Sequence, residues 1–373
     1  MPLVDRSGTV HNWDAVTWCG SDRSPLSFSD LALGDVPNPH TVDGSVWNWA
    51  SWFPVPSIKP LTLGEGGTPL VPASWLGGDV HLKLDNLHPT GSFKDRGAAL
   101  VVAALRQAGA MHLLEDSSGN GGASMAAYAA AAGLTARVLV PVGTSPAKIA
   151  VTKSYGAEVV EVPGDRQATS SEALRQVEDG EWVYASHAWH PLFPVGVATQ
   201  ALEIWWQLGR RAPRTVVVVA GGGSMVLGHD LAWRALRSAG LIDSLPHLVM
   251  VQPMACAPLV DAWQTAAVDV DPAFVAQSPT VAEGTAIAHP VRDREVLAAL
   301  RRLDGVAVAT SEESILAAQH ELASHGHDVE PTAANAVAGW HQTDIANGTT
   351  VIVMSGSGHK LHWSLRARTR HDW

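Results

Sequence analysis

Short apolar runs alternate with alanine-rich stretches of helical period along most of the chain, from about residue 56 onward. Apolar runs of about 4 to 8 residues between turn residues are typical of buried strands, and apolar positions three or four apart are typical of helices. The pattern predicts strands at residues 80–84, 111–114, 137–140, 158–162, 215–219, 247–251, 305–309 and 350–354. It predicts helices at residues 94–108, 122–133, 145–154, 168–178, 196–209, 224–239, 312–324 and 332–341. Such alternation indicates an α/β fold with parallel-rich, twisted sheets flanked by helices.

Residues 1–55 differ from the rest, because they are rich in Pro, Gly, Ser and Asp and show little periodicity. We expect an irregular N-terminal extension with local turns. The tryptophans near this end of the chain are Trp13, Trp18, Trp47, Trp49, Trp52 and Trp75. Tryptophan is mostly highly buried, so packing or a dimer contact is the favoured explanation for them. Packing is also favoured for Trp189, Trp205 and Trp206, for which the alternative is a wall of a substrate pocket.

Composition narrows the class of partner. The 373 residues carry a net charge of −11 without a run of like charges, which argues against nucleic acid or an anionic membrane as a partner. Cys19 and Cys256 lie far apart, so no disulfide framework is expected. The N-terminal residues lack the apolar segment of a signal peptide, and no apolar run is long enough to span a membrane. We therefore expect a soluble cytoplasmic protein.

A lysine follows a predicted strand and a Pro/Gly turn in the segment PTGSFKDRG, residues 89–97. Ser92 could cap the helix that comes next, which would put Lys94 in the first helical turn. The helix dipole disfavours a cation there. One interpretation is an exposed lysine paired with Asp95. The other is an amine whose position favours its uncharged form, which would help it to form a Schiff base.

Three further segments could bind parts of a small anionic ligand. The loop SSGNGG at 117–122 offers backbone N–H groups and hydroxyls suited to a carboxylate, although a flexible turn would use the same residues. The loop GGGS at 221–224 follows a buried strand and starts a helix, which is typical of a phosphate cradle. It matches neither a P-loop nor a dinucleotide fingerprint, so a monophosphate fits better than NAD. Ser355, after the last strand, could hydrogen-bond a heterocyclic nitrogen.

Taken together and in this order, these segments resemble the threonine synthase-like branch of the fold-type II (tryptophan synthase β-like) pyridoxal-phosphate-dependent enzymes. The segments that carry the resemblance are LGEGGTPL (63–70), PTGSFKDRG (89–97), SSGNGG (117–122), GGGS (221–224), VEPTAA (329–334) and MSGSGHK (354–360). The resemblance covers residues 60–362. It implies a two-domain fold, pyridoxal 5'-phosphate as cofactor, a small amino-acid substrate and a homodimer.

The resemblance also implies residue roles. Lys94 would be catalytic, forming the Schiff base with the cofactor and moving the α-proton of the substrate. The other cofactor-binding residues would be Phe93, Asn120, Gly221, Gly222, Gly223, Ser224, Met225 and Ser355. The substrate-binding residues would be Ser117, Ser118, Gly119, His88 and Phe193. No metal site is expected. A neutral hydroxyl at Ser355 would favour elimination and replacement over transamination.

The chain departs from the family pattern where a substrate phosphate would be bound. Threonine synthases carry a segment like NPxRxEGQKT, and here its arginine aligns with Phe193 and its acid with Val195. A phenyl ring in place of the arginine removes the main anion contact. His88 also replaces an asparagine, and the cysteine-rich segment that many relatives have before LGEGxTPL is reduced to Cys19-Gly20.

These departures predict β- or γ-elimination or replacement on a small amino acid, with threonine synthase acting on O-phosphohomoserine as the alternative. His88, His190 and His359 are candidates for a second acid–base group, because imidazole titrates near neutral pH. His187 and His190 are three residues apart, but we expect them to line the pocket or cap a loop rather than bind a metal.

We expect a large cofactor-binding domain from residues 56–92 and 193–373, and a small mobile domain from residues 93–192. The cofactor would lie in the cleft between them, with closure over the substrate excluding water. Two rival hypotheses are a non-catalytic phosphate-ligand-binding homologue, and a homologue that holds the cofactor but has lost turnover.

Overall fold

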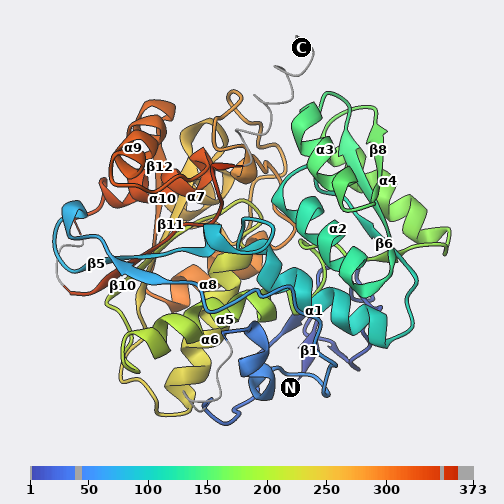
Figure 1. The fold of residues 1–373 in the computed structure, drawn as a ribbon, viewed down its shortest axis with the longest axis horizontal. Coiled ribbons are helices and arrows are strands. Elements are labelled where there is room, and N and C mark those ends of the chain that lie inside the picture. Colours follow the sequence, from blue (N-terminus) through green and yellow to red (C-terminus); the bar gives the residue numbers. More distant parts are fainter. Residues whose placement is uncertain (1, 38–43, 345–347, 360–373) are drawn as a thin grey trace. The chain divides into compact units, whose positions relative to one another are not determined.

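Residues 2–37, 44–344 and 348–359 are the part of the chain that the computed structural model describes. The chain is divided into two units. The first contains the described residues of Met1–Glu65 and His88–Gly196, and the second contains Gly66–Leu87 and Val197–His359. In Figure 1, β6 and β8 belong to the first unit and β5, β10 and β12 to the second. The domain boundaries predicted from the sequence stay a prediction.

The first unit is built on a four-stranded parallel sheet in the order β8-β7-β6-β9. Its strands are β6 (His112–Glu115), β7 (Thr135–Pro141), β8 (Glu158–Val162) and β9 (Val183–Tyr184). Helix α1 (Lys94–Gln107) precedes them, and the helices between them are α2 (Asn120–Ala132), α3 (Pro146–Ser154) and α4 (Arg166–Glu178). Local sequence sets the helix ends. Asp165 caps α4 by accepting from the Ala168 N–H at 2.9 Å, and Gly133 ends α2 in the left-handed conformation.

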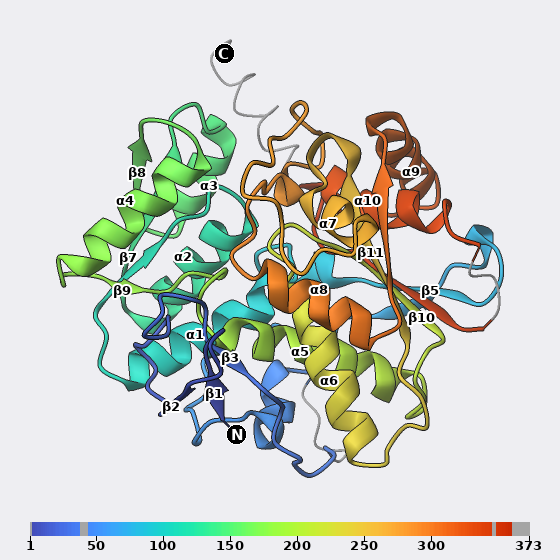
Figure 2. The ribbon, with the colours of Figure 1, turned by 180° about the vertical axis from the view of Figure 1, so that it is seen from behind.

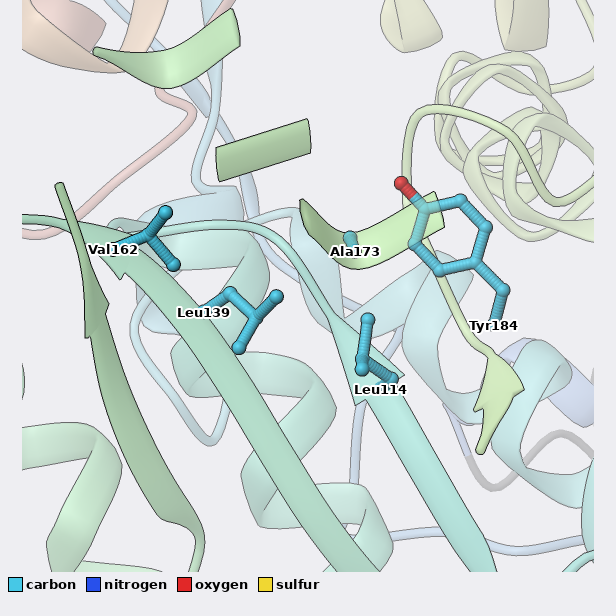
Figure 3. Close-up of a cluster of buried hydrophobic side chains, with 5 residues drawn as sticks. All are labelled: Leu114, Leu139, Val162, Ala173 and Tyr184. Carbon is cyan, nitrogen blue, oxygen red and sulfur yellow. The ribbon is translucent and has the colours of Figure 1, made fainter. Parts of the chain in front are cut away.

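Apolar side chains from this sheet and from α4 form a tight core. Figure 3 shows the five buried members, and they are Leu114, Leu139, Val162, Ala173 and Tyr184. They come from all four strands of the sheet and from α4, so the core holds β6 and β9 side by side. β6 is followed directly by Asp116, and β9 is followed by Ala185 and then by the polar residues Ser186 and His187.

Residues 1–55 contain three short antiparallel strands in the order β2-β1-β3, seen in dark blue in Figure 2. They are β1 (Leu3–Val4), β2 (Val10–His11) and β3 (Ser27–Phe28), and a 3₁₀ helix, η1 (Val46–Trp52), follows. Trp18 packs edge-on against Tyr184 and Trp189, with ring centroids 5.2 and 5.1 Å apart. Tryptophans thus tie this segment to the sheet of the first unit, as the packing interpretation predicts.

The second unit contains a six-stranded sheet in the order β12-β11-β10-β13-β5-β4, parallel except for the edge pair β4–β5. The strands are β4 (Leu70–Pro72), β5 (Val80–Lys83), β10 (Thr215–Val219), β11 (His247–Pro253), β12 (Val306–Thr310) and β13 (Thr350–Val353). The helices are α6 (Ser224–Ser238), α7 (Pro258–Gln264), α8 (Asp293–Arg302), α9 (Glu312–Ser324) and α10 (Pro331–Trp340). Helix α5 (Leu192–Gln207) begins in the first unit and ends in the second. Short 3₁₀ turns are η2 (Ser74–Leu76), η3 (Asp85–Leu87), η4 (Met254–Cys256) and η5 (Glu283–Thr285).

A buried polar network holds the edge of the second sheet to α5. The fully buried Lys83 ammonium donates to the Glu203 carboxylate, the Gln207 side-chain carbonyl and the Thr68 carbonyl, each at 2.8 Å. A buried cation costs several kcal/mol unless such partners surround it. Asp85 accepts from the Thr68 hydroxyl at 2.6 Å, so the network continues into the turn after β5.

All of the predicted strands and helices are present, and the α/β fold with parallel-rich sheets is confirmed. The largest shift is in α5, which begins at Leu192 rather than residue 196. Sequence analysis missed α7, α8, the antiparallel β4 and the two-residue β9. The N-terminal extension is less irregular than predicted, because it contains β1–β3 and η1.

Candidate active site

Lys94 is the first residue of α1, as predicted, and its amine lies near two phenyl rings. Its Nζ is 4.8 Å from the centroid of the Phe93 ring and 5.5 Å from that of Phe193. The prediction that Ser92 caps the helix is wrong. Phe93 occupies the cap position without a side-chain hydrogen bond, and the Ser92 hydroxyl is buried with no hydrogen-bond partner among the described residues.

The buried Asp95 carboxylate fixes the turn that carries Lys94. It accepts from the Thr90 N–H at 2.7 Å, the Thr90 hydroxyl at 2.5 Å and the Ser124 hydroxyl at 2.6 Å. Ser124 is on α2, so Asp95 joins the start of α1 to the helix that follows the loop SSGNGG. Asp95 is thus a structural residue, in contrast with its predicted alternative as a chance surface partner of Lys94.

Phe193, the second residue of α5, is completely buried. A Cβ built on Gly97 would lie 2.5 Å from the Phe193 ring, so the ring lies directly against the backbone of α1. It also packs edge-to-face with the His187 ring, with centroids 5.7 Å apart. The position that aligns with a phosphate-gripping arginine therefore holds an apolar side chain packed beside Lys94.

The loop SSGNGG connects β6 to α2, which begins at Asn120 rather than at the predicted residue 122. Ser117 is buried, and its hydroxyl accepts from the Gly119 N–H at 3.4 Å. Gly122 packs so closely on the Ser117 carbonyl that a Cβ there would overlap it. The loop is therefore a packed turn at a helix N-terminus, where backbone N–H groups favour an anion.

Two residues that were not predicted as a pair, Glu115 and His187, meet at the carboxyl ends of the neighbouring strands β6 and β9. His187 Nδ1 lies 3.0 Å from Glu115 Oε1, and the His187 N–H donates to Oε2, also at 3.0 Å. Burial, with help from the Asp116 charge, raises the pKa of Glu115 to about 8. Burial, followed by the charges of Lys94 and Arg166, lowers the pKa of His187 well below its usual value. Both side chains are therefore uncharged near neutral pH.

Asp116 next to them is ionised. Burial opposes its ionisation, but the Arg166 charge and the hydroxyls of Ser170 and Tyr184 outweigh burial and lower the pKa of Asp116. The Ser170 hydroxyl donates at 2.5 Å and the Tyr184 hydroxyl at 3.0 Å. A neutral carboxylic acid and a carboxylate thus stand side by side at the end of β6.

In the second unit, β10 and β13 are adjacent and parallel, so the residues that follow them lie at the same end of the sheet. These residues belong to the predicted segments GGGS (221–224) and MSGSGHK (354–360). The loop 221–223 follows β10, and α6 begins at Ser224. Gly223 has φ +78°, and a Cβ there would overlap Val296; a Cβ on Gly222 would meet nothing among the described residues nearer than Ile287 at 4.0 Å. The open side of the loop is therefore at Gly222, and Met225 is buried behind it.

Gln252 supports this loop from β11. Its side-chain amide donates to the Ala220 carbonyl at 3.0 Å, and its side-chain oxygen accepts from the Leu259 and Val260 N–H groups at 2.9 and 3.1 Å. Gln252 stands where a dinucleotide-binding fold would place a ribose-binding acid. Its capping role at α7 agrees with the exclusion of NAD.

Ser355 follows β13 and is 1% exposed. Its Oγ is buried and has no hydrogen-bond partner among the described residues. Such a hydroxyl costs free energy unless a ligand supplies the partner. Ser357 differs, because its hydroxyl accepts from the His359 N–H at 3.3 Å. Lys360, the last residue of the MSGSGHK segment, lies outside the described residues.

The histidines predicted as acid–base candidates have different surroundings. His190 is fully buried: its Nε2 lies 2.9 Å from the Ala15 carbonyl, and its Nδ1 accepts from the Leu192 N–H at 3.2 Å. Both ring nitrogens are thus used to hold the start of α5, so the acid–base prediction for His190 is wrong and the loop-capping one is confirmed. His359 is largely exposed and pairs with Asp328 at 2.9 Å. His88 is buried just before the Lys94 turn.

A family model described as pyridoxal-phosphate dependent enzyme matches residues 61–356. The chain belongs to this family. A pyridoxal-phosphate dependent enzyme of this type catalyses elimination or synthase reactions on amino acids, and the protein is a pyridoxal-phosphate-dependent lyase with that cofactor.

Threonine synthases are similar in sequence to most of this chain. The threonine synthase of Methanosarcina acetivorans is 33% identical over 346 residues, which are 90% of this chain and 84% of the relative. The threonine synthase of Mycobacterium tuberculosis H37Rv is 34% identical over 312 residues, 81% of this chain and 84% of the relative.

Solved structures agree with the fold. The T.th. threonine deaminase superposes with a TM-score of 0.67 at 28% identity, covering 78% of this chain and 92% of that one. Maize serine racemase gives a TM-score of 0.68 at 20% identity over 82% of this chain and 93% of that one, a likeness of fold. The fold-type II assignment from the sequence is therefore confirmed.

The residues present fit the cofactor of this family. The unpartnered Ser355 hydroxyl suits a ring nitrogen, and the open side of the glycine loop at a helix N-terminus suits a phosphate. A lysine at the start of α1, with its turn fixed by Asp95, provides an amine for a Schiff base. The individual roles predicted for these residues stay predictions.

Sequence analysis missed the Glu115–His187 pair, because the two residues are 72 positions apart. One signal was available: Glu115 directly follows the apolar residues of β6, and the carboxyl ends of parallel strands are where α/β folds place ligand-binding groups. No helix among the described residues has the length and apolar character needed to cross a membrane. Within the same residues, no cluster of three His, Cys, Asp or Glu side chains could hold a metal ion.

Proposed function

We propose that this lyase eliminates or replaces a small, uncharged leaving group on a small amino acid, and that it does not act on O-phosphohomoserine. The observation that carries this proposal is the buried phenyl ring of Phe193 beside Lys94, 5.5 Å from Nζ. A phosphate dianion placed against that ring would lose its hydration without gaining a fork of N–H donors.

The residue roles follow from the chemistry of each group. Pyridoxal phosphate supplies the electron sink when it is bound. Lys94 carries it and then moves the α-proton; Ser117, Ser118 and Gly119 bind the substrate carboxylate at the N-terminus of α2; His88 and Phe193 contact the substrate. Residues 221–224 bind the cofactor phosphate, Ser355 donates to its ring nitrogen, and Phe93, Asn120 and Met225 complete its site.

Threonine synthase is the second candidate, and the two named relatives at 33% and 34% identity favour it. It would require a cationic phosphate site from residues other than the one that aligns with the family arginine. Arg166, beside Asp116, is a charge that could attract such a phosphate. The two candidates therefore differ in whether the substrate carries a second phosphate.

The test is a substrate panel on the purified holoenzyme. O-phosphohomoserine, L-serine, L-threonine, O-acetyl-L-serine and β-chloro-L-alanine are each incubated with enzyme, and keto acid, ammonia, threonine and inorganic phosphate are measured. We expect keto acid and ammonia from at least one unphosphorylated substrate. Release of threonine and phosphate from O-phosphohomoserine at an enzyme-like rate would overturn the proposal in favour of the second candidate.

Experiments on the same holoenzyme preparation distinguish the two rival hypotheses from the proposed function. Borohydride reduction followed by peptide mapping is expected to label Lys94, and Lys94→Ala is expected to remove the label and all turnover. A label at Lys94 with no turnover of any substrate would support the cofactor-holding homologue instead. Absence of the label would support the non-catalytic phosphate-binding homologue.

The same proposal includes the location of the protein, its oligomeric state and its domain movement. A cytoplasmic location is supported by the two distant cysteines, which form no disulfide among the described residues. A homodimer follows the family resemblance and is tested by light scattering on the holoenzyme. Residues 93–192 are proposed to form a small domain that closes over the substrate, which hydrogen exchange with and without a substrate analogue would test.

A further inference from the structure

The Glu115–His187 pair is not needed for the roles proposed above, yet it lies among the residues that carry them. A Cβ built on Gly121 would be 2.8 Å from His187 Nδ1 and 3.0 Å from its Cε1. The imidazole therefore packs on the loop assigned to the substrate carboxylate. Its edge meets the Phe193 ring, whose centroid is also 5.5 Å from Lys94 Nζ.

The hydrogen bonds of Glu115 orient the imidazole of His187 from its Nδ1 side. Glu115 accepts from the Asp116 and His187 N–H groups, each at 3.0 Å, which fixes its carboxyl plane against Nδ1. The Glu115 side chain is 2% exposed, whereas that of His187 is 8% exposed. Glu115 thus holds the Nδ1 side of the ring inside the protein, and the ring keeps a small accessible area.

We propose that His187, oriented by Glu115, is the acid that protonates the leaving group of the substrate during elimination. The inference rests on the proposed function, because it requires a substrate whose leaving group departs through oxygen. Lys94 then moves only the α-proton, and His187 protonates the oxygen of the leaving group.

The proton transfer is balanced within the pair. The carbon–oxygen bond breaks with its electron pair going to oxygen, and His187 Nε2 gives its proton to that oxygen. Nδ1 takes the proton of the Glu115 carboxyl group, which leaves a neutral imidazole and a carboxylate. Solvent returns one proton to the pair before the next turnover, so no oxidant or co-reactant is needed.

The charges around His187 suit this role. Lys94 on α1 and Arg166 on α4 oppose a cationic imidazole, and the carboxylate of Asp116, directly after β6, opposes ionisation of Glu115. Tyr184 on β9 donates to Asp116 and holds that carboxylate in place. A neutral pair can supply a proton without first placing a buried positive charge beside Lys94.

The experiment compares two substrates that differ in their leaving groups. L-serine, or L-threonine if it is the better substrate, must have its hydroxyl protonated, whereas β-chloro-L-alanine loses chloride without an acid. His187→Asn in the holoenzyme is expected to lower kcat for the hydroxyl substrate by about 10²- to 10⁴-fold, and kcat for β-chloro-L-alanine by less than about 10-fold.

Glu115→Gln is the conservative second variant. Its amide can still donate to Nδ1 and hold the ring, but it cannot surrender a proton. We expect the same selective loss with the hydroxyl substrate. In the wild type, kcat for that substrate is expected to fall as pH rises through about 8, where Glu115 loses its proton, and Glu115→Gln is expected to lack this limb. Cofactor absorbance and thermal unfolding report whether each variant is folded and loaded.

Equal loss of rate on both substrates in the folded variants would overturn the inference while leaving the proposed function intact. So would a wild-type enzyme that eliminates chloride but no hydroxyl group. Failure of the wild type on every substrate of the panel would instead remove the proposed function, and the inference with it.

Discussion

The ring of Phe193 occupies the space that a side chain at residue 97 would need. A Cβ built on Gly97 would lie 2.5 Å from one ring carbon and 2.6 Å from two others. Glycine at this position lets the ring of α5 reach the backbone of α1, and that contact keeps the phenyl group beside Lys94.

This contact predicts coupled effects on stability. Gly97→Ala is expected to cost about 1–3 kcal/mol by overpacking, and Phe193→Ala about 3–5 kcal/mol by leaving a cavity. In the double variant the added methyl group enters that cavity, so the loss is expected to be smaller than the sum by about 0.5–3 kcal/mol. Urea unfolding of the four proteins measures the coupling, and strictly additive losses would contradict the packing argument.

The Glu115–His187 pair predicts a pH dependence of stability. Between pH 6.5 and about 8 the folded protein holds a proton on Glu115 that the unfolded chain, with its carboxyl pKa near 4.5, has lost. The free energy of unfolding should therefore fall as pH rises through this interval. Between about pH 4.5 and 6.5, the neutral His187 contributes an opposite trend, because there the unfolded chain gains a proton.

Glu115→Gln is expected to abolish the contribution of Glu115 to the fall in the free energy of unfolding between pH 6.5 and about 8. Urea titrations at a series of pH values measure this free energy. Glu158→Gln is a suitable control, since Glu158 pairs with Arg137 at the surface of the same sheet. If Glu115→Gln and the wild type showed parallel pH curves, Glu115 would not be protonated in the folded state.

Ser355→Ala separates a ligand-binding hydroxyl from a structural one. Because Ser355 Oγ has no partner among the described residues, removing it should leave the cofactor-free protein as stable as the wild type, or more so. Cofactor affinity should fall by about 2- to 10-fold, the loss of one hydrogen bond of about 0.5–1.5 kcal/mol. Ser357→Ala is the neighbouring control, and equal cofactor dissociation constants for all three proteins would argue against the assigned role.

The glycine loop offers a second matched comparison. Gly222→Ala places its methyl group on the open side of the loop, so the cofactor-free protein should unfold as the wild type does while cofactor affinity falls by at least about 10-fold. Gly223→Ala should destabilise the protein itself, because its φ is +78° and its Cβ would overlap Val296. Cofactor binding by Gly222→Ala at wild-type affinity would show that the phosphate binds elsewhere.

Periodicity in the sequence was enough to predict the long elements. Each run such as Val216–Val219 is apolar because it is buried on both faces of a parallel sheet. The alanine-rich helices α1, α2 and α10 are apolar because they are buried over most of their length. β9 and β4 were missed because strands of two and three residues are too short to show a period. Helix α8 follows a long irregular stretch, from which no strand leads into it.

Motifs predicted the parts of the site that are continuous in sequence. Lys94, the loop at 117–122 and the loop at 221–224 were recognised because each is a turn at the start of a helix. The Glu115–His187 pair depends on β6 and β9 being neighbours, which is a property of the folded sheet. Burial then shifts the pKa values of Glu115 and His187. Burial at the end of a strand cannot be predicted from a local sequence pattern.

The N-terminal segment lies outside the family match, yet it completes the first unit. The Ala15 carbonyl lies 2.9 Å from His190 Nε2, and Trp18 covers Tyr184 and Trp189. A recombinant fragment trimmed to the family boundary at residue 61 would strip these partners away. It would expose the rings of Tyr184 and Trp189, and His190, which holds the start of α5, would lose its contact with the Ala15 carbonyl. Expression vectors, fusions and domain exchanges for this enzyme should therefore keep the first 55 residues, although the family match begins only at residue 61.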